Sequence, residues 1–324
     1  MAQTELAGTR GKQDRAQPAH AQRPREVCPN HRFFHWFMAG MSALLLAMAA
    51  ICVLFLRYRL QAPLFDDYAG LAAILVAAGY CRWAKFERFF QVCLIVFWSH
   101  AMGKLLAFPV YLAARSPIPL QDGALAHFDK AIGLEVPPIL QLMANHPWIK
   151  ATLAVSYDLL FPLMVLGVLL PAIRYRWTAV KELIVGTSMA TILGSAMFAL
   201  CPAIGPWAVY HFPPSAQQKT CETLFLTLRT NSIHVLSPAD TGIICFPSFH
   251  VLLAILSCIA LCSIRALRIP TIVVASGVAI STLTTGWHYI ADVLGGLILA
   301  AFAIWIAKLY TRLEARFTSH AHTE

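Results

Sequence analysis

The sequence CFPSFHVLLAILS, residues 245–257, places a proline, a serine and a histidine directly before an apolar run. The run continues to about residue 264 and is typical of the start of a membrane-spanning helix. Ionisable groups inside or at the rim of such helices are costly, so they are taken as functional by default. His250 is therefore a candidate site residue. Its partners must come from other segments of the chain.

The composition is that of a membrane protein. Of the 324 residues, 58% are hydrophobic and 13% are charged, which is outside the range of soluble globular domains. The apolar residues recur in stretches of about 17–25, the length that a helix needs to cross ~30 Å of hydrocarbon. We therefore predict an all-α polytopic membrane helix bundle. Its predicted transmembrane helices, about eight, cover residues 35–56, 64–80, 89–113, 151–173, 182–201, 249–264, 269–286 and 288–307.

Three segments are predicted along the chain. Residues 1–30 are polar and rich in Gln, Ala and Arg, so we expect a disordered cytoplasmic tail. Residues 31–312 form one membrane domain, and residues 313–324 form a second cytoplasmic tail.

The distribution of basic residues predicts the orientation. An even number of spans puts both termini on one side, and that side then carries 17 of the 25 Lys and Arg residues. By the positive-inside rule this side is cytoplasmic. The net charge of +9 is explained by this topology and by contact with anionic lipid head groups. We expect no nucleic-acid partner.

A second histidine is predicted to lie beside the first. His288 occurs in TTGWHYIADVLGG, 38 residues after His250. Between them the chain runs inward, turns at the basic sequence IRALRIP and returns. A helical hairpin of this kind brings both imidazoles to the same, outer face of the membrane. This face is in contact with a periplasm or a lumen.

The residues around the two histidines suit an anion. Asp292 follows His288 by four residues, the spacing of neighbours on one helix face. Its carboxylate can bind one ring nitrogen of His288 and leave the other free to react. Pro247 and Ser248 lie where a helix begins, and the unpaired N–H groups of a helix start favour a phosphate.

Two motifs carry a family resemblance. PSFH, residues 247–250, resembles the P-S-G-H motif of the type 2 phosphatidic acid phosphatase superfamily, which includes vanadium haloperoxidases. STLTTGWHYIAD, residues 281–292, resembles the S-R-x5-H-x3-D motif of the same superfamily. The resemblance covers residues of about 120–310.

The chain also departs from the superfamily pattern. Phe249 replaces the glycine of the first motif and Thr282 replaces the arginine of the second, while the usual K-x6-R-P motif is absent. These departures are similar to those of the branch related to fungal inositol phosphorylceramide synthase. CPAIGPW, residues 201–207, resembles the Pro-rich stretch of that branch.

The resemblance implies a six-helix phosphatase-like core and a metal-independent reaction without a cofactor. His288 would be the nucleophile that forms a phosphohistidine, Asp292 would orient it, and His250 would protonate the leaving oxygen. Pro206 and Trp207 would contact the substrate. Asp129, Tyr157 and Asp158 resemble recurrent positions of the branch without an assigned chemistry.

The implied function is a membrane lipid phosphatase or phosphotransferase. Its substrate would be a lipid phosphoester at the outer leaflet. Hydrolysis and head-group transfer share the phosphohistidine, and transfer would use an alcohol or a ceramide as acceptor. The sequence leaves this choice and the identity of the lipid open.

The missing arginine raises the question of which cation binds the phosphate, because phosphoryl transfer depends on such charges. Lys104 lies within a predicted span, where a lysine is costly unless it is paired or lines a polar cavity. It could face the site or pair with an acid such as Asp158. Arg229 and Lys219 could reach over the site or remain solvated loop charges.

Other functions and one bond stay open at this stage. Two histidines and an aspartate could form a metal-binding facial triad. They could also relay protons in a transporter, although a transporter places such groups near the midplane of the bilayer. Cys221 and Cys245 could form a disulfide or remain free thiols.

Overall fold

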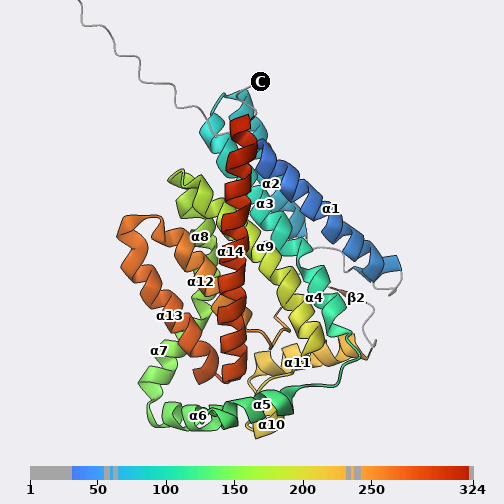
Figure 1. Cartoon of the computed structure of the whole chain (residues 1–324), viewed down its shortest axis with the longest axis vertical. Coiled ribbons are helices and arrows are strands. Elements are labelled where there is room, and N and C mark those ends of the chain that lie inside the picture. The colour runs from blue at the N-terminus through green and yellow to red at the C-terminus, as the bar shows by residue number, and fades with distance from the viewer. Residues whose placement is uncertain (1–30, 55–58, 61–64, 231–234, 237–241, 321–324) are drawn as a thin grey trace, which may run out of the picture.

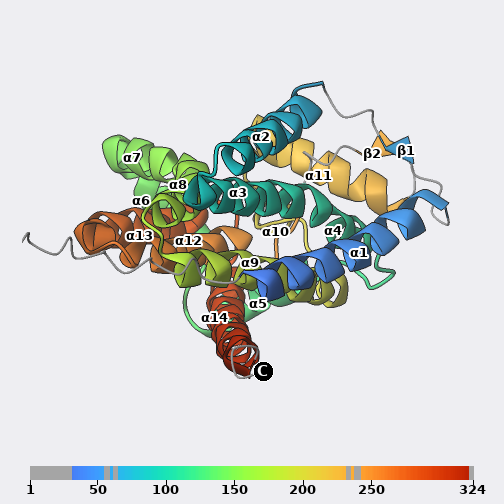
Figure 2. The ribbon, with the colours of Figure 1, turned by 90° about the horizontal axis from the view of Figure 1, so that it is seen from above.

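The computed structural model describes residues 31–54, 59–60, 65–230, 235–236 and 242–320. These residues form a bundle of helices (Figures 1 and 2), so the predicted all-α membrane fold is confirmed. The exception is one parallel pairing of the two-residue strands β1 (Arg59–Leu60) and β2 (Val235–Leu236). The predicted tail at residues 1–30 and the last four residues, 321–324, lie outside the described part.

Five helical segments in the described part are long and apolar enough to cross a membrane, or six if a bent pair counts as one span. The eight predicted spans all fall on helices, but two of them, in α2 (Phe65–Trp83) and α12 (Phe249–Cys262), are shorter apolar helices. The number eight therefore stays a prediction. The other spans are α1 (Arg32–Leu54), α3 (Glu87–Leu105) with α4 (Ala107–Ala114), α7 (Pro147–Asp158) with α8 (Leu160–Ile173), α9 (Trp177–Leu200), α13 (Arg268–Thr284) and α14 (Ile290–His320).

Prolines explain two breaks within these spans. Pro109 follows the break between α3 and α4, and Pro162 follows the break between α7 and α8. Because proline has no N–H, it cannot donate to the carbonyl four residues earlier, and the helix ladder is interrupted there. The two helices α7 and α8 are bent by 41° relative to each other.

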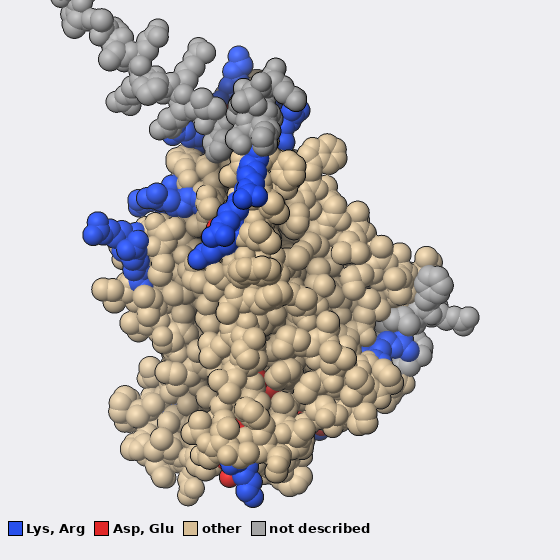
Figure 3. Space-filling view, in the orientation of Figure 1, with Lys and Arg blue, Asp and Glu red and all other residues tan. Residues whose placement is uncertain are grey.

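Short helices gather at one end of the bundle. They are α5 (Asp122–Ala131), α6 (Val136–Asn145), α10 (Trp207–Tyr210) and α11 (Ala216–Arg229), at the lower end in Figure 1. The helix α14 begins at this end and runs along the length of the bundle to His320, so residues 313–320 of the predicted tail extend this helix. Most of the Lys and Arg on the face seen in Figure 3 lie toward the opposite end, with smaller basic patches at the right edge and at the lower end.

A buried ion pair joins α9 to α14 near the basic end. Lys181 Nζ lies 2.6 Å from Glu314 Oε1, and both side chains are almost fully covered. Toward the other end, α9, α12 and α14 share an apolar core that includes Ala190, Leu252 and Ala300. The helix α12 thus packs within the bundle, between α8, α9, α13 and α14.

A tight turn at the end of α13 sets the position of His288. Gly286 has a φ of 72°, in the left-handed region. The N–H of Gly286 donates to Leu283 and the N–H of Trp287 donates to Thr282, which is the hydrogen-bond pattern of a Schellman cap. The chain therefore reverses directly before His288.

Candidate active site

His288 and Asp292 form a buried pair at the start of α14. Nδ1 of His288 lies 3.2 Å from Oδ2 of Asp292, and the two residues are 2% and 0% exposed. His288 precedes the first helical residue, Ile290, so the pair spans the beginning of the helix and does not lie on its regular face. The contact fixes which ring nitrogen faces the carboxylate and leaves Nε2 for other chemistry.

The carboxylate of Asp292 accepts two further hydrogen bonds on the same oxygen. The N–H of Tyr289 donates at 2.8 Å and the thiol of Cys245 donates at 3.1 Å. Burial, and then the nearby carboxylate of Asp292, raise the pKa of the Cys245 thiol well above its usual range. Cys245 is therefore a neutral thiol and serves Asp292 as a donor.

His250 lies beside this pair, on the first turn of α12. Its ring centroid is 5.9 Å from that of His288, as the hairpin of α12 and α13 predicts. On its other side the ring of Tyr157, from α7, stacks on it at 4.3 Å with an angle of 25° between the planes. Tyr157 also stacks on Trp287 at 5.9 Å. The aromatic contacts hold the imidazole in one orientation.

The beginning of α12 is packed tightly against α14. Ser248 is fully buried and caps α12, with its hydroxyl accepting from the N–H of Val251. Its own N–H donates to the carbonyl of Asp292 at 2.9 Å. A Cβ at Gly296 would meet the Ser248 carbonyl oxygen at 2.5 Å, so only glycine permits this approach.

Phe249, the residue in place of the motif glycine, fills a notch in α9. A Cβ at Gly194 would lie 2.6 Å from Cζ of its ring. The bulky side chain therefore points into the bundle, away from the two imidazoles. Among the described residues, no backbone carbonyl or side chain accepts from the N–H groups of Phe249 and His250. These donors are the helix-start groups that were predicted to suit a phosphate.

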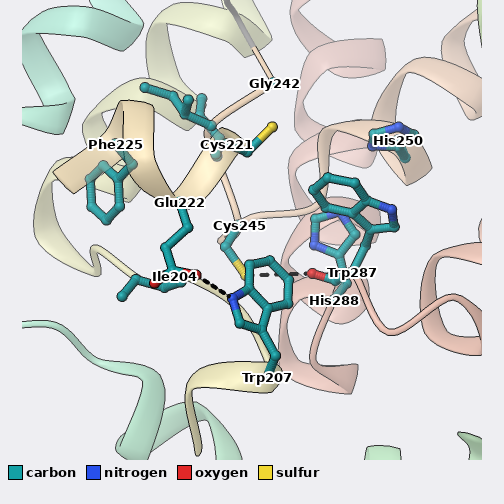
Figure 4. A pocket seen from close by; sticks show the side chains of 12 residues that line it. Ile204, Trp207, Cys221, Glu222, Phe225, Gly242, Cys245, His250, Trp287 and His288 are labelled. Atoms are coloured by element: carbon teal, nitrogen blue, oxygen red, sulfur yellow. Dashed lines mark hydrogen bonds between the residues drawn. The ribbon is translucent and has the colours of Figure 1, made fainter. Parts of the chain in front are cut away.

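A small cavity of about 20 Å³ opens in front of the two histidines (Figure 4). Figure 4 shows His250, Trp287 and His288 on one side and Glu222 and Phe225 on the other. Trp207 also lines the cavity, and its indole N–H donates to Glu222 at 3.0 Å. No Lys or Arg is among the described residues that line the cavity.

A comparison with models of protein families matches residues 123–306, more than half of the chain, to the PAP2 superfamily. The chain belongs to this superfamily. No curated protein and no solved structure matches it. Membership in the PAP2 superfamily indicates a phosphatase-type enzyme, and the matched residues contain every side chain of the site described above.

The predicted cations are not at the cavity of this PAP2 domain. Lys104 lies in α3, outside the matched residues, and Arg229 lies at the end of α11, where its guanidinium donates to the carbonyl of Ile118. Lys219 does not line the cavity, but it pairs with the lining residue Glu222 at 3.1 Å. Its side chain is 63% exposed, so the Lys219–Glu222 pair is largely solvated on the lysine side.

The helix α5 holds two parts of the site together. Of this helix, only Asp129 was singled out from the sequence, and its role was not predicted. The Asp129 carboxylate accepts from the N–H groups of Ile290 and Ala291, both at 2.8 Å. Asp122 accepts from the N–H groups of Ile204 and Gly205. Burial raises the pKa of both carboxyl groups, while their backbone donors act in the opposite direction.

Tyr289 connects these two contacts. Its hydroxyl lies 3.2 Å from Oδ1 of Asp122 and 3.0 Å from the carbonyl of Gly205. The sequence carries a weak signal of this role, because Tyr289 directly follows His288. The segment that contains Pro206 and Trp207 is thereby fixed relative to the histidine.

Gln218 is a second missed residue. It is 2% exposed, and its amide donates to the carbonyls of Thr285 and Gly286, at 3.3 and 3.1 Å. It also completes a capping box with Ser215 at the start of α11. This polar contact anchors α11, and with it Glu222, against the turn before His288.

The possible metal ligands differ from the predicted triad. Within the described residues, the group with ligand atoms within 4.8 Å of one another is Cys245, His288 and Asp292. His250 is not part of this group. The eight described cysteines are free thiols, including Cys221 and Cys245.

Proposed function

We propose that this PAP2 protein cleaves a phosphoester of a membrane lipid through a phosphohistidine on His288. The observation that carries the proposal is the buried His288–Asp292 pair, at 3.2 Å, with the imidazole of His250 beside it. A nucleophile held by a carboxylate, with a second group in reach to protonate the leaving oxygen, is the arrangement for nucleophilic catalysis with a separate general acid.

The first step transfers the phosphoryl group to His288. Nε2 attacks phosphorus, the bond from phosphorus to the lipid oxygen breaks, and His250 gives that oxygen a proton. Asp292 stabilises the positive charge that His288 acquires. In the second step water or an alcohol attacks the phosphohistidine and gives up its proton to His250, which restores both histidines. Water gives hydrolysis and an alcohol such as ceramide gives head-group transfer.

The location of the site supports a lipid substrate at one membrane surface. The two histidines lie at the end of the bundle from which α14 starts, while most Lys and Arg of the face in Figure 3 lie toward the other end. By the positive-inside rule, the basic end and both termini are cytoplasmic and the site faces a periplasm or a lumen. Ionisable groups at the rim, away from the midplane, favour an enzyme over a proton-coupled transporter.

The nature of the substrate-binding groups is also part of the proposal. The free N–H groups at the start of α12, next to Pro247 and Ser248, bind the phosphate, and Trp207 contacts the substrate. Phe249 and the segment CPAIGPW support a relation to the inositol phosphorylceramide synthase branch. Lys219 is better placed than Lys104 or Arg229 to supply a cation, because its partner Glu222 lines the cavity.

A metal-dependent reaction is the second candidate, since Cys245, His288 and Asp292 present the sulfur, nitrogen and oxygen ligands that suit Zn²⁺.

Trapping of the intermediate separates the two. Rapid acid-free quenching of wild-type protein with radiolabelled lipid phosphate should yield acid-labile, base-stable phosphate on the chain. His288→Ala should yield none. Turnover without a protein-bound phosphate, or labelling that survives in His288→Ala, contradicts the proposal.

A further inference from the structure

A second and larger cavity lies in the middle of the bundle, between α3, α8, α9 and α12. Its volume is about 110 Å³, against about 20 Å³ for the cavity at the histidines. Its lining is mainly apolar and includes Met102, Met164, Val168 and Leu253. The described residues that line it include no charged side chain.

Four of the twelve described lining residues carry a hydroxyl group, and two of these hydroxyl groups already have partners. Ser99 donates to Ile95 at 3.0 Å and Ser188 donates to Ile184 at 2.8 Å, each within its own helix. A water molecule needs two to four polar partners to be held in a cavity. The chemistry of the lining therefore suits a hydrocarbon.

The cavity lies in line with the histidines along α12. Leu253 and Ser257 line the cavity, and they follow His250 by three and seven residues, so all three share one face of the helix. At about 1.5 Å per residue the cavity lies roughly 5–10 Å deeper in the membrane than His250. On α9, Thr187 of the cavity and Gly194, which contacts Phe249, are also seven residues apart.

We propose that this cavity holds a segment of one acyl chain of the lipid whose phosphate reaches His288. The inference rests on the proposed function and adds a binding site for the apolar part of the substrate. An apolar cavity of about 150 Å³ accepts a benzene molecule, so by that comparison the present cavity fits roughly four methylene groups. The rest of the chain lies among the surrounding lipids.

The cavity contributes by positioning the acyl chain and not by a favourable hydrophobic free energy of binding. A chain that leaves the bilayer for the cavity exchanges one apolar surrounding for another. What it acquires is a fixed path below the catalytic groups, which aligns the phosphorus with His288. Misplacement of about 1 Å can lower a rate by about 100-fold, so a blocked cavity should lower kcat/KM for long-chain substrates.

Gly103 permits a clean test. It lines the cavity, and a Cβ added there meets no atom within 4 Å. Gly103→Leu therefore starts its side chain in open space at the cavity, and it also favours the helix, because leucine has the higher helix propensity. Gly40→Leu on α1 is the matched control: its Cβ also meets nothing within 4 Å, and it does not line the cavity.

The kinetic experiment compares dioleoyl phosphatidate with nitrophenyl phosphate in detergent. Gly103→Leu should lower kcat/KM for the lipid by about tenfold and leave the soluble ester within about twofold of wild type, with Gly103→Ala between. Gly40→Leu should change neither. An equal loss on both substrates, or no loss on the lipid, overturns the acyl-chain site. Wild-type protein that is inactive on both substrates overturns the proposed function instead.

A binding measurement decides the site independently of activity. A phosphatidate with a diazirine midway along one acyl chain is photolysed with the His288→Ala variant, and the labelled residues are mapped by mass spectrometry. Labels should fall on Met164, Val168 or Leu253 and be lost in Gly103→Leu. A phosphatidylcholine probe that labels these residues equally well identifies a resident bilayer lipid, and the absence of label identifies an empty cavity; both overturn the inference.

Discussion

The thiol of Cys245 donates to Oδ2 of Asp292, the oxygen that also faces His288. Cys245→Ala removes one of three hydrogen bonds to this oxygen, so the carboxylate becomes the stronger partner for a cationic imidazole. We expect the acidic limb of the kcat/KM–pH profile to move to higher pH by about half a unit. This shift corresponds to about 0.7 kcal/mol, because one pH unit corresponds to about 1.4 kcal/mol.

Cys245→Ser is the control, because a hydroxyl keeps a donor at the same position. Its profile should stay at or below the wild-type pH. Coincident profiles for alanine and serine would show that the thiol only fills space.

The two histidines should respond differently to the leaving group. His250→Ala removes the proton donor, which is typically worth about 10²–10⁴-fold for a poor leaving group. Nitrophenyl phosphate, whose leaving group needs no proton, should still phosphorylate His288 in this variant while a lipid phosphate does not. Single-turnover measurements with both substrates test this, and equal losses on both would reject His250 as the acid.

The activity of Asp292→Asn should lie between those of His288→Ala and His250→Ala. The amide keeps a contact with Nδ1 but loses the charge that stabilises the phosphorylated imidazole. Activity on nitrophenyl phosphate should fall substantially, without the rescue seen for His250→Ala. Activity of Asp292→Asn close to wild type on both substrates would remove Asp292 from the proposed mechanism.

Orthovanadate should inhibit the enzyme, whereas chelators should not. Vanadate forms a five-coordinate adduct that resembles the in-line transition state on a histidine, so micromolar to millimolar concentrations should inhibit competitively. EDTA should leave the activity intact. Activity that disappears with EDTA and returns with one particular metal would favour a metal at Cys245, His288 and Asp292.

Labelling of introduced cysteines tests the orientation. Ala216 at the start of α11 and Thr178 at the start of α9 are both exposed, and they lie toward opposite ends of the bundle. An impermeant maleimide in intact cells should modify Ala216→Cys but not Thr178→Cys, above the background of the native cysteines. After permeabilisation both should react. The reverse pattern in intact cells would place the site in the cytoplasm.

The contact between Gly194 and Phe249 gives a prediction on stability. A Cβ on Gly194 would overlap the Phe249 ring at 2.6 Å, so Gly194→Ala should lower the free energy of unfolding by about 1–3 kcal/mol. Combining it with Phe249→Ala should recover part of this loss. Thermal unfolding in detergent measures both variants, with Gly40→Ala as the unhindered control. Additive losses in the double variant would contradict the contact.

The fold and the pair of motifs were accessible from sequence because they depend on local patterns. Apolar stretches of membrane length gave the helix bundle, and the hairpin between His250 and His288 needed only a turn at IRALRIP. The four-residue spacing predicted that Asp292 lies beside His288, and the contact forms although His288 precedes the helix. These inferences involve residues that are close in the chain or joined by one reversal.

The remaining parts of the site depend on contacts between distant segments. Asp122 is 82 residues from Ile204 and Asp129 is 161 residues from Ile290, and no spacing rule connects them. In the sequence Gln218 is an ordinary polar residue, and only the structure shows that its amide donates to the carbonyls of Thr285 and Gly286. Lys104 was predicted from its place within a span and Arg229 from its place in the outer loop, and neither position shows which cavity a side chain faces.

The start of α14 is closed to outside ligands. Tyr289 donates its N–H to Asp292, Ile290 and Ala291 donate theirs to Asp129, and Asp292 donates to the carbonyl of Tyr289. Two carboxylates thus occupy the positive end of α14, and the N–H groups of residues 289–292 are all bonded within the described part of the chain. In the proposed mechanism the carboxylate of Asp292, and not the positive helix end, stabilises the positive charge on phosphorylated His288, while the free N–H groups of α12 bind the incoming anion. On that proposal, capture of the substrate and storage of the phosphoryl group would depend on the starts of two different helices.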